Sequence, residues 1–350
     1  MNNAFIDGIE RLTEGDWLAA VGSLKGDIHE VDRNATQVWF RFFPLDLVRY
    51  LESADDVVAT MKGLRLEGDF GLLDKIDTSH YFLYGHRYWP QVKAAIEMRA
   101  DVGEAAGDLA TEIRDIARSA AASAKVDESL TLGIAAVGLM TLVQAGYDDF
   151  KAAAGTVEKT LKTKDSGNMT RSPEEIVTAR AKDDSQGMLG FLRTVNKEFS
   201  VRFKATEYDG KFKIMNEEEI TSASQKDRSR QWQEIDPRCW EGPVPVECTS
   251  ASCGTCWIGV VGGQEKISEP SARERKAMKV FGYNQPEDPK PFLRLGCQAK
   301  AAGNVSIVIP TWNAVFGKKV RGGIEDVELE PNTTSAKKLR ETIASAVKGE

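Results

Sequence analysis

The cysteines of this chain are spaced in a way that few folds can accommodate. Cys248, Cys253 and Cys256 follow one another with four and then two intervening residues, and Cys297 follows after forty more intervening residues. Five cysteines in 350 residues is an odd and low number, which argues against a disulfide framework, whereas clustered cysteines point to metal. We therefore expect the fold to bring Cys297 back to the loop that carries the other three.

The residues between these cysteines suit a two-iron cluster. Each iron needs two thiolates, and the spacing C-x4-C-x2-C with a distant fourth cysteine is that of plant-type [2Fe–2S] ferredoxins. A tight loop can wrap three sulfurs around such a cluster, while the fourth arrives from a distant strand end or turn. Backbone N–H groups can point at sulfur where the loop is built of small residues. Six small residues fill this loop: Thr249, Ser250, Ala251, Ser252, Gly254 and Thr255.

On these motifs, residues 197–312 resemble the β-grasp [2Fe–2S] ferredoxin family. The run Cys-Thr-Ser-Ala-Ser-Cys-Gly-Thr-Cys-Trp at 248–257 is similar to the family's cluster loop. The run Arg-Leu-Gly-Cys-Gln at 294–298, followed by Gly-Asn-Val-Ser-Ile-Val-Ile-Pro at 303–310, is similar to its last ligand and final strand. The resemblance implies that four cysteines ligate iron and that single electrons pass through the cluster. They are Cys248, Cys253, Cys256 and Cys297.

The chain departs from the family pattern at three places. Ala251 stands where many members have glycine, the interval between the third and fourth cysteines is longer than in the compact plant members, and residues 216–247 are extended. These departures bear on the identity of the redox partner rather than on the cluster.

Two other interpretations of the four cysteines compete with a cluster. A structural zinc site usually uses two C-x2-C pairs, and only one is present here. Unligated core cysteines are the other alternative. The fifth cysteine, Cys239, is predicted to be a partly buried free thiol, with a substitute ligand or a redox thiol as the alternative.

Composition and periodicity predict a multidomain α and α+β chain. Residues 1–160 show helical spacing of apolar residues, and a helical stripe is expected from Val102 to Ile116. Residues 161–195 are polar and free of aromatic residues up to position 188, which predicts a linker with one short helix after Ser172. Residues 196–325 are expected to form the ferredoxin-like domain, and residues 326–350 a mobile tail with one helix.

Period-two alternation marks the strands of the second domain. Phe199, Val201, Phe203 and Ala205 alternate with polar residues, and Asp209-Gly210 precedes Phe212 and Ile214, which predicts a β-hairpin. Further strands are expected at Trp257–Val261 and Val305–Ile309, and a helix is expected to open at Ser268-Glu269-Pro270 and to end at Gly282.

Residues 129–147 contain no charge over nineteen positions, which is long enough to span a bilayer. However, Thr131, Thr141 and Gln144 interrupt the run, acids flank it on both sides, and no Lys/Arg asymmetry favours insertion. A buried helix in a helical core or a subunit interface is therefore favoured over membrane contact.

Charge and termini restrict the partners and the compartment. The net charge of −7 and the pI of about 5.3 argue against nucleic acid as the main partner. The N-terminus has neither a basic region nor an apolar run typical of a signal peptide. The expectation is a cytoplasmic protein, with a peripheral membrane location as the alternative.

Other chemistry-bearing residues give weaker signals. His80 and His86 are six residues apart among aromatic residues, which favours packing or an interface over a haem or quinone pocket. Glu217-Glu218-Glu219 is expected to be a solvated face, and on a ferredoxin-like fold it could dock a basic partner. No dinucleotide-binding, P-loop or hydrolase-elbow motif is visible.

The sequence therefore predicts one-electron transfer through a [2Fe–2S] cluster and no catalytic residue. The chain would be an electron-transfer subunit or a dedicated carrier that docks on a redox enzyme through its helical domain, or that forms a homo-oligomer through it. The alternative is an oligomerising scaffold or a cofactor-binding helical domain, in which the cluster is an internal relay or a redox sensor.

Overall fold

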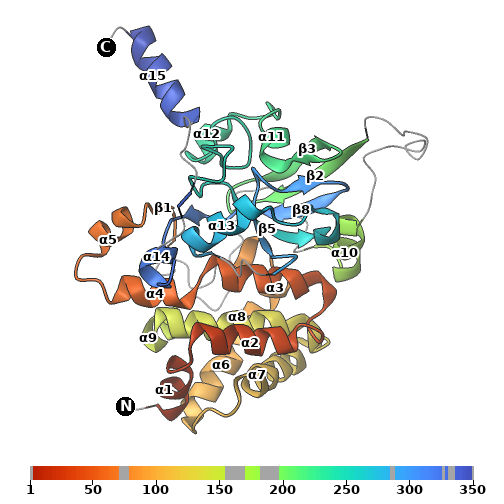
Figure 1. Cartoon of the computed structure of the whole chain (residues 1–350). Helices are drawn as coiled ribbons and strands as arrows, with labels where there is room; N and C mark the ends of the chain where they lie inside the picture. The colour runs from red at the N-terminus through yellow and green to blue at the C-terminus, as the bar shows by residue number, and fades with distance from the viewer. Residues whose placement is uncertain are drawn as a thin grey trace. The chain divides into compact units, whose positions relative to one another are not determined.

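The chain divides into two units. The computed structural model describes residues 3–70, 79–153, 170–181, 197–283, 288–324, 328–329 and 336–348. Unit 1 comprises residues 1–53 and 70–178, and unit 2 comprises residues 54–69 and 179–350. Unit 1 is helical and unit 2 combines helices with a mixed sheet, which confirms the predicted α and α+β classes (Figure 1).

The helices of unit 1 pack around α8 (Ser129–Ala145), which contacts α3, α6, α7 and α9. Almost the whole circumference of α8 is buried, as expected for an apolar helix without an amphipathic face. Within the described residues, no helix combines the length and the apolar character needed to cross a membrane. The helices around it are α1 (Ala4–Glu10), α2 (Glu14–Leu24), α3 (Glu30–Phe42), α4 (Leu45–Glu52), α6 (Trp89–Val102), α7 (Leu109–Ala124) and α9 (Tyr147–Ala152).

Three polar side chains of α8 donate hydrogen bonds inside the helical unit. The hydroxyl of Thr131 donates to the Ala117 carbonyl at 2.8 Å, that of Thr141 donates to the Val137 carbonyl at 2.8 Å, and Nε2 of Gln144 donates to the Phe43 carbonyl at 3.0 Å. Gly138 admits close packing, because a Cβ there would lie 2.8 Å from Cδ1 of Ile96. These contacts explain why a nineteen-residue run without charge contains polar side chains.

The stripe predicted from Val102 to Ile116 is not one helix. Gly103 adopts a left-handed φ of 71° after α6, and Asp108 caps the start of α7 by accepting a hydrogen bond from the Thr111 amide at 3.0 Å. Val102 is consequently 63% exposed, outside the core that Ile113 and Ile116 enter. The sequence signals for the interruption between α6 and α7 are Gly103 and the capping residue Asp108, not the spacing of the apolar residues.

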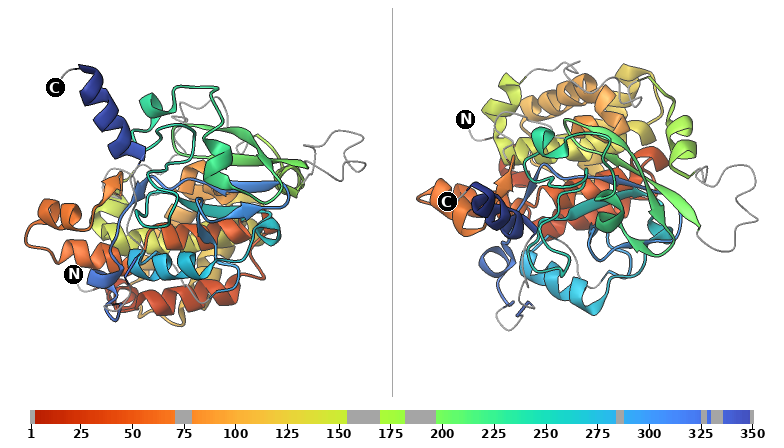
Figure 2. Two further views of the ribbon diagram at one scale, coloured as in Figure 1. Left: turned by 45° about the horizontal axis from the view of Figure 1, so that its top comes forward. Right: turned by 90° about the horizontal axis from the view of Figure 1, so that it is seen from above.

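A five-stranded sheet forms the centre of unit 2, with the strand order β3-β2-β8-β5-β6. Strands β2 and β3 form the predicted antiparallel hairpin, β2 and β8 are parallel, and β5 is antiparallel to both β8 and β6. Figure 2 shows the green hairpin beside the blue β8. The strands are β2 (Glu198–Lys204), β3 (Asp209–Met215), β5 (Trp257–Gly262), β6 (Leu293–Leu295) and β8 (Val305–Val308).

Alternate residues of these strands fill a core on one face of the sheet. Phe203 stacks on Phe212 across the hairpin with ring centroids 5.8 Å apart, and Trp232 packs edge-on against Phe203. Apolar side chains from the other strands complete this cluster: Val201, Ile214, Ile258, Val260, Val305 and Ile307. The period-two pattern thus reports the buried face of the sheet.

Shorter elements complete unit 2. The helix predicted near Ser268 begins later, as α13 (Ala272–Phe281), because the Ser271 hydroxyl caps it by accepting from the Glu274 amide at 3.1 Å; Gly282 ends it as predicted. The remaining elements are β4 (Glu218–Glu219), β7 (Lys300–Ala301), α11 (Ile220–Ser224), α12 (Trp232–Ile235), the 3-10 turn η4 (Gln264–Lys266), α14 (Gly317–Val320) and α15 (Ala336–Lys348).

Residues 54–69, which the sequence placed in the helical domain, belong to unit 2. They contain α5 (Val57–Gly63) and β1 (Glu67–Gly68), and β1 pairs with β9 (Trp312–Asn313). Gly68 has a φ of 87°, and a Cβ there would lie 2.2 Å from the Thr311 carbonyl oxygen. A two-residue strand has no periodicity that sequence inspection could detect.

Most of the segment predicted as a linker, 161–195, lies outside the described residues. Its described part contains α10 (Pro173–Ala181), the short helix expected after Ser172. The Ser172 hydroxyl accepts from the Glu175 amide at 3.2 Å, and the Glu175 carboxylate accepts from the Ser172 amide at 2.9 Å. This reciprocal pair is a capping box.

Candidate functional site

The sheet of unit 2 brings two of the predicted ligands together. Cys256 directly precedes β5, and Cys297 lies two residues beyond β6. The two strands are antiparallel with Trp257 opposite Leu295, and the Gly296 amide donates to the Cys256 carbonyl at 2.8 Å. Strand pairing therefore places Cys256 and Cys297 side by side, close enough for the Cys297 side chain to raise the pKa of Cys256.

The loop before β5 positions the other two. It turns back on itself and brings the Cys253 thiol close enough to Cys248 to lower the pKa of Cys248. The Ser252 amide and hydroxyl point at Sγ of Cys248, at 3.4 and 3.5 Å. The Ser250 amide also lowers the pKa of this thiol. The small residues of the loop thus direct N–H groups at sulfur, as their size predicted.

All four thiols are buried, with exposed fractions of 5% or less. Hydrogen bonds from the Cys253 thiol and then from Ser252 outweigh burial and lower the pKa of Cys248 to about 4, whereas the bond to Cys248 and burial raise the pKa of Cys253. The thiol bond to Cys297, with burial, raises the pKa of Cys256 well above its usual range. The four sulfurs form two pairs, and Cys253 is near enough to Cys256 to interact electrostatically.

The four cysteines are not joined by disulfides, and all five in the chain are free thiols. In the part of the chain that the structure describes, no group of three or more His, Cys, Asp or Glu side chains is arranged to hold a metal ion. The four cysteines are instead arranged as two pairs, Cys248 with Cys253 and Cys256 with Cys297. Two irons with two thiolates each match such pairs in number, and the amide donors around Cys248 suit a group that carries negative charge.

Gln298 connects the cysteine loop, residues 248–256, to the segment that follows β6. Nε2 of Gln298 donates to the Thr249 carbonyl at 3.1 Å and approaches Sγ of Cys297 at 3.6 Å. The Thr255 hydroxyl donates to the Glu247 carboxylate at 3.3 Å. Gln298 was part of the motif recognised in the sequence, but its bridging of the two segments is visible only in the fold.

Two left-handed residues give the loop its curvature. Ala251 has a φ of 57° and Gly254 a φ of 79°. A side chain in this region costs about 1–2 kcal/mol. Ala251 therefore adopts a conformation that glycine accommodates more easily.

We expect opposite effects from two substitutions in this loop. Ala251→Gly should raise the free energy of unfolding of unit 2, by up to about 1 kcal/mol, because it removes this strain. Gly254→Ala should lower it by about 1–2 kcal/mol, because it adds strain and places a Cβ 3.3 Å from the Phe281 ring. Urea unfolding followed by tryptophan fluorescence measures both, and equal effects of the same sign would contradict the loop conformation.

A buried pair of charges supports the strand that leads to Cys297. The guanidinium of Arg294, on β6, donates from Nε and Nη2 to the Glu274 carboxylate of α13 at 2.9 and 2.8 Å. The same carboxylate accepts from the Leu295 amide at 2.9 Å, and Nη1 of Arg294 donates to the Ser268 carbonyl at 2.6 Å. The Glu274 side chain is fully buried and that of Arg294 is 4% exposed. The pair fixes α13 against β6 immediately before the fourth cysteine.

Cys239 lies apart from the four and is fully buried, rather than partly buried as predicted. Its Sγ is 3.3 Å from the Tyr208 hydroxyl oxygen and 3.4 Å from the Pro243 carbonyl oxygen. Burial, together with the nearby Asp236 carboxylate, raises the pKa of this thiol to about 12.

We expect Cys239 to resist alkylation in the native protein. At pH 8 a thiol with this pKa is almost wholly protonated, and the thiolate is the reactive form. Iodoacetamide should therefore label the peptide containing Cys239 only after unfolding in urea, as mass spectrometry of the digest would report. Native labelling at the rate of glutathione would show that the thiol is accessible and ionised.

The remaining candidates occupy packing or paired positions. Nδ1 of His86 is 3.2 Å from the Ser79 hydroxyl, and its ring stacks on Trp89 with centroids 6.3 Å apart; the His80 and His86 rings meet edge to face. The Glu218 carboxylate binds Lys226 and the Met215 amide, and Glu219 lies 3.6 Å from Lys300. Glu218 and Glu219 are thus half-buried and paired, unlike the solvated face expected, whereas Glu217 is exposed as expected.

Comparison with known proteins identifies no relative of this chain. No family model, no curated protein and no solved structure matches the chain. The function is therefore argued from the thiols and their surroundings.

Proposed function

We propose that the chain is a one-electron carrier whose unit 2 is a β-grasp domain holding one [2Fe–2S] cluster. Cys248 and Cys253 would bind one iron, and Cys256 and Cys297 the other. The observation that carries the proposal is the convergence of these four cysteines, two from one loop and two from paired strand ends, into two buried thiol pairs.

The sheet order supports the β-grasp assignment. An N-terminal hairpin, β2 and β3, supplies one side of the sheet, the late strand β8 lies parallel to β2, and β5 and β6 complete the other side. A helix, α13, intervenes between β5 and β6 in the chain. This is the arrangement expected for the family that residues 197–312 resemble.

When bound, such a cluster supplies a single-electron redox couple. The chain's own residues would hold and adjust it. The Ser252 amide donates to Cys248, and donors to ligand sulfur stabilise the extra negative charge of a reduced state. Burial of the thiols excludes water, and Gln298 fixes the segment of Cys297 against the loop.

Anaerobic purification, with iron and sulfide counted and an electron paramagnetic resonance spectrum recorded after dithionite reduction, tests the proposal. We expect two irons and two sulfides per chain and a rhombic signal. Cys253→Ser should lose the signal and most of the iron, because it removes one of four thiolates. The matched variant Cys239→Ser should keep both, because that thiol lies apart from the pairs.

Stoichiometric zinc in a colourless protein would overturn this proposal. So would a Cys253→Ser protein that keeps its full complement of iron and sulfide.

A further inference from the structure

Gln298 is the first residue after the last of the four candidate ligands, and its side chain spans two segments. Its Nε2 donates to the Thr249 carbonyl of the cysteine loop at 3.1 Å and to the Cys297 carbonyl at 2.9 Å. The same nitrogen lies 3.6 Å from Sγ of Cys297, which is a hydrogen-bond distance for sulfur. One amide group thus contacts both the loop and a candidate ligand sulfur.

These contacts determine which end of the Gln298 amide faces the sulfur. Both carbonyls are acceptors, so the NH2 group and not the amide oxygen is directed at them. This group has two hydrogens for three acceptors, namely the two carbonyl oxygens and Sγ of Cys297. Hydrogen bonds to charged acceptors are the stronger ones, so a sulfur that gains negative charge competes better for these hydrogens. The contact therefore strengthens when an electron is added to a group that Cys297 holds.

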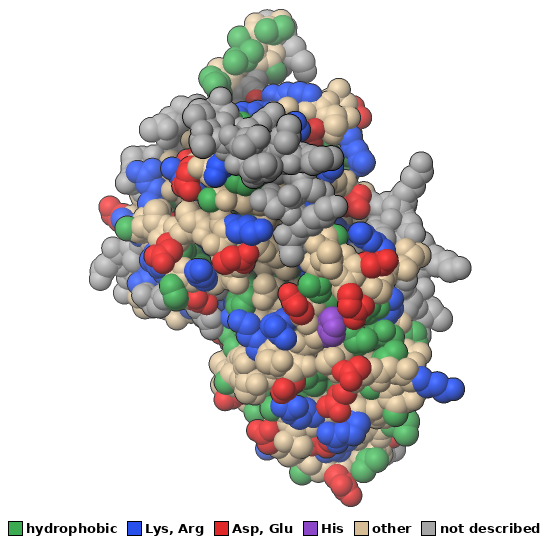
Figure 3. Space-filling model, turned by 90° about the vertical axis from the view of Figure 1, so that its right-hand side faces the viewer, with side chains coloured by type: hydrophobic (Ala, Val, Ile, Leu, Met, Phe, Trp, Pro, Cys, Tyr) green, Lys and Arg blue, Asp and Glu red, His purple; other side chains and the backbone are tan. Residues whose placement is uncertain are grey.

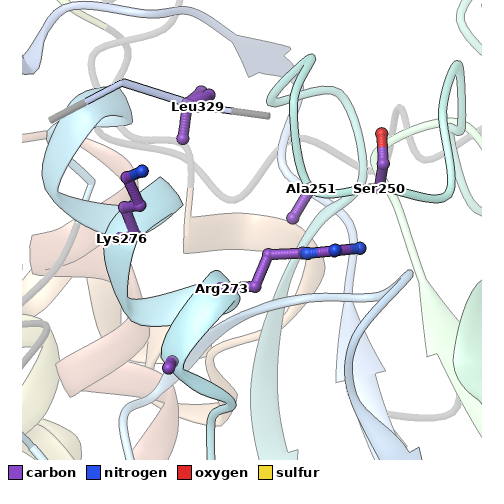
Figure 4. Close-up of a pocket in the computed structure, with 6 residues that line it drawn as sticks. Ser250, Ala251, Arg273, Lys276 and Leu329 are labelled. Carbon is purple, nitrogen blue, oxygen red and sulfur yellow. The ribbon is translucent and has the colours of Figure 1, made fainter. Parts of the chain in front are cut away.

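The cysteine loop is incompletely packed on one side. A hollow of about 240 Å³ is lined by Ser250 and Ala251 of the loop and by residues of α13, among them Arg273. Figure 4 shows the Arg273 side chain extending from α13 toward the loop. Thr249, the next residue back along the loop, is exposed. The hydrogen bond from Gln298 to the Thr249 carbonyl therefore restrains a part of the loop that packing restrains little.

The charges on the protein surface do not replace a local donor to sulfur. The net charge of −7 opposes the addition of an electron. The described part of the face drawn in Figure 3 intersperses Lys and Arg with Asp and Glu side chains, and exposed charges of mixed sign offset one another and are screened by salt. Gln298 is half-buried and acts directly on one sulfur.

We propose that Gln298 is a positioning residue that raises the reduction potential of the cluster and holds the cysteine loop closed over it. The proposal rests on the proposed function and assigns the adjustment of that site to one side chain. The N–H directed at Cys297 favours the reduced state, because donors to ligand sulfur stabilise its extra negative charge. The N–H directed at Thr249 limits opening of the loop.

The test replaces the Gln298 amide in two ways. Gln298→Leu removes the donor at similar size, whereas Gln298→Lys keeps N–H donors and adds a positive charge. The control Gln264→Leu makes the same change in another half-buried glutamine, whose Nε2 donates to the Lys290 carbonyl and which lies beyond the far end of β5 from Cys256. Anaerobically purified proteins are titrated with dithionite at measured potentials and followed by electron paramagnetic resonance.

We expect Gln298→Leu to decrease the equilibrium constant for reduction by about threefold to tenfold, which lowers the potential by about 30–60 mV. Gln298→Lys should raise the potential, because positive charge beside the sulfur favours the reduced state, and the control should change the constant by less than about twofold. Opposite shifts distinguish an electrostatic effect on the cluster from a loss of structure, which would move both Gln298 variants in the same direction.

Metal-free protein tests the restraint on the loop separately. Iodoacetamide should label the peptide that contains Cys248, Cys253 and Cys256 about fivefold faster in Gln298→Leu than in the wild type, because the loop opens more often without the bond to Thr249. The control Gln264→Leu should be labelled at the wild-type rate. Equal rates in all three proteins would overturn the restraint.

Gln298→Leu and Gln298→Lys proteins that keep the wild-type potential, or that shift it in the same direction, would overturn the effect on the potential and leave the carrier standing. A wild-type protein that contains neither iron nor sulfide would overturn the carrier, and the effect on the potential with it.

Discussion

Glu274→Ala should destabilise unit 2 by about 3–5 kcal/mol, because it leaves the buried guanidinium of Arg294 without its carboxylate. The substitution also removes the acceptor of the Leu295 amide on β6. Urea unfolding monitored by fluorescence gives the loss. If the cluster is present, its visible absorption should bleach at a lower urea concentration, because β6 leads directly to Cys297.

The control for this prediction is Glu269→Ala, which removes an exposed carboxylate just before the same helix. Its effect should stay within about 0.5 kcal/mol. A Glu274→Ala protein as stable as the control would mean that Arg294 finds other acceptors or that water enters the site.

Asp32→Ala should destabilise unit 1 by a similar amount, about 3–5 kcal/mol. The Asp32 side chain is 1% exposed on α3, and its two oxygens accept from the Tyr84 and Gly85 amides at 2.7 and 2.6 Å. Hydrogen bonds to a charged group contribute about 1.5–3 kcal/mol each, and alanine leaves both buried amides without this acceptor. Thermal unfolding followed by circular dichroism measures the loss of helix.

Two further variants serve as controls for the Asp32→Ala prediction. Asp32→Asn keeps one acceptor oxygen and should lie between alanine and the wild type. Glu30→Ala, on the exposed first turn of the same helix, should cost only a few tenths of a kcal/mol. If the asparagine variant equals the wild type, the charge of Asp32 contributes nothing and shape alone matters.

The two fold classes and the strands were predictable because each is encoded over short distances. Alternation from Phe199 to Ile214 predicted the hairpin, and the structure confirms it. Helical boundaries depended on single residues, so the stripe through Val102 was wrong where Gly103 ends α6.

The partners of buried charges could not be predicted. Arg294 was in a recognised motif and Glu274 in a predicted helix, but a charged residue in a sequence is by default assigned to the surface, and these two meet only after α13 packs on β6. The prediction of a solvated Glu218 was wrong for the same reason, because the fold pairs its carboxylate with Lys226. The cysteine spacing predicted that four thiols would meet, and the loop and strand register bring them into pairs, but their iron remains a prediction.

The pairing of β1 with β9 affects how the protein can be made and divided. The chain leaves unit 1 after residue 53, contributes residues 54–69 to unit 2, and returns at residue 70. During synthesis, β1 leaves the ribosome more than two hundred residues before β9, so it stays unpaired while residues 70–178 of unit 1 are synthesised. An expression fragment that begins at residue 179 would contain every cysteine but would lack the strand that covers Trp312 and Asn313. Isolating unit 2 therefore requires a circular permutant that carries residues 54–69, or a co-expressed 54–69 peptide, rather than a simple truncation.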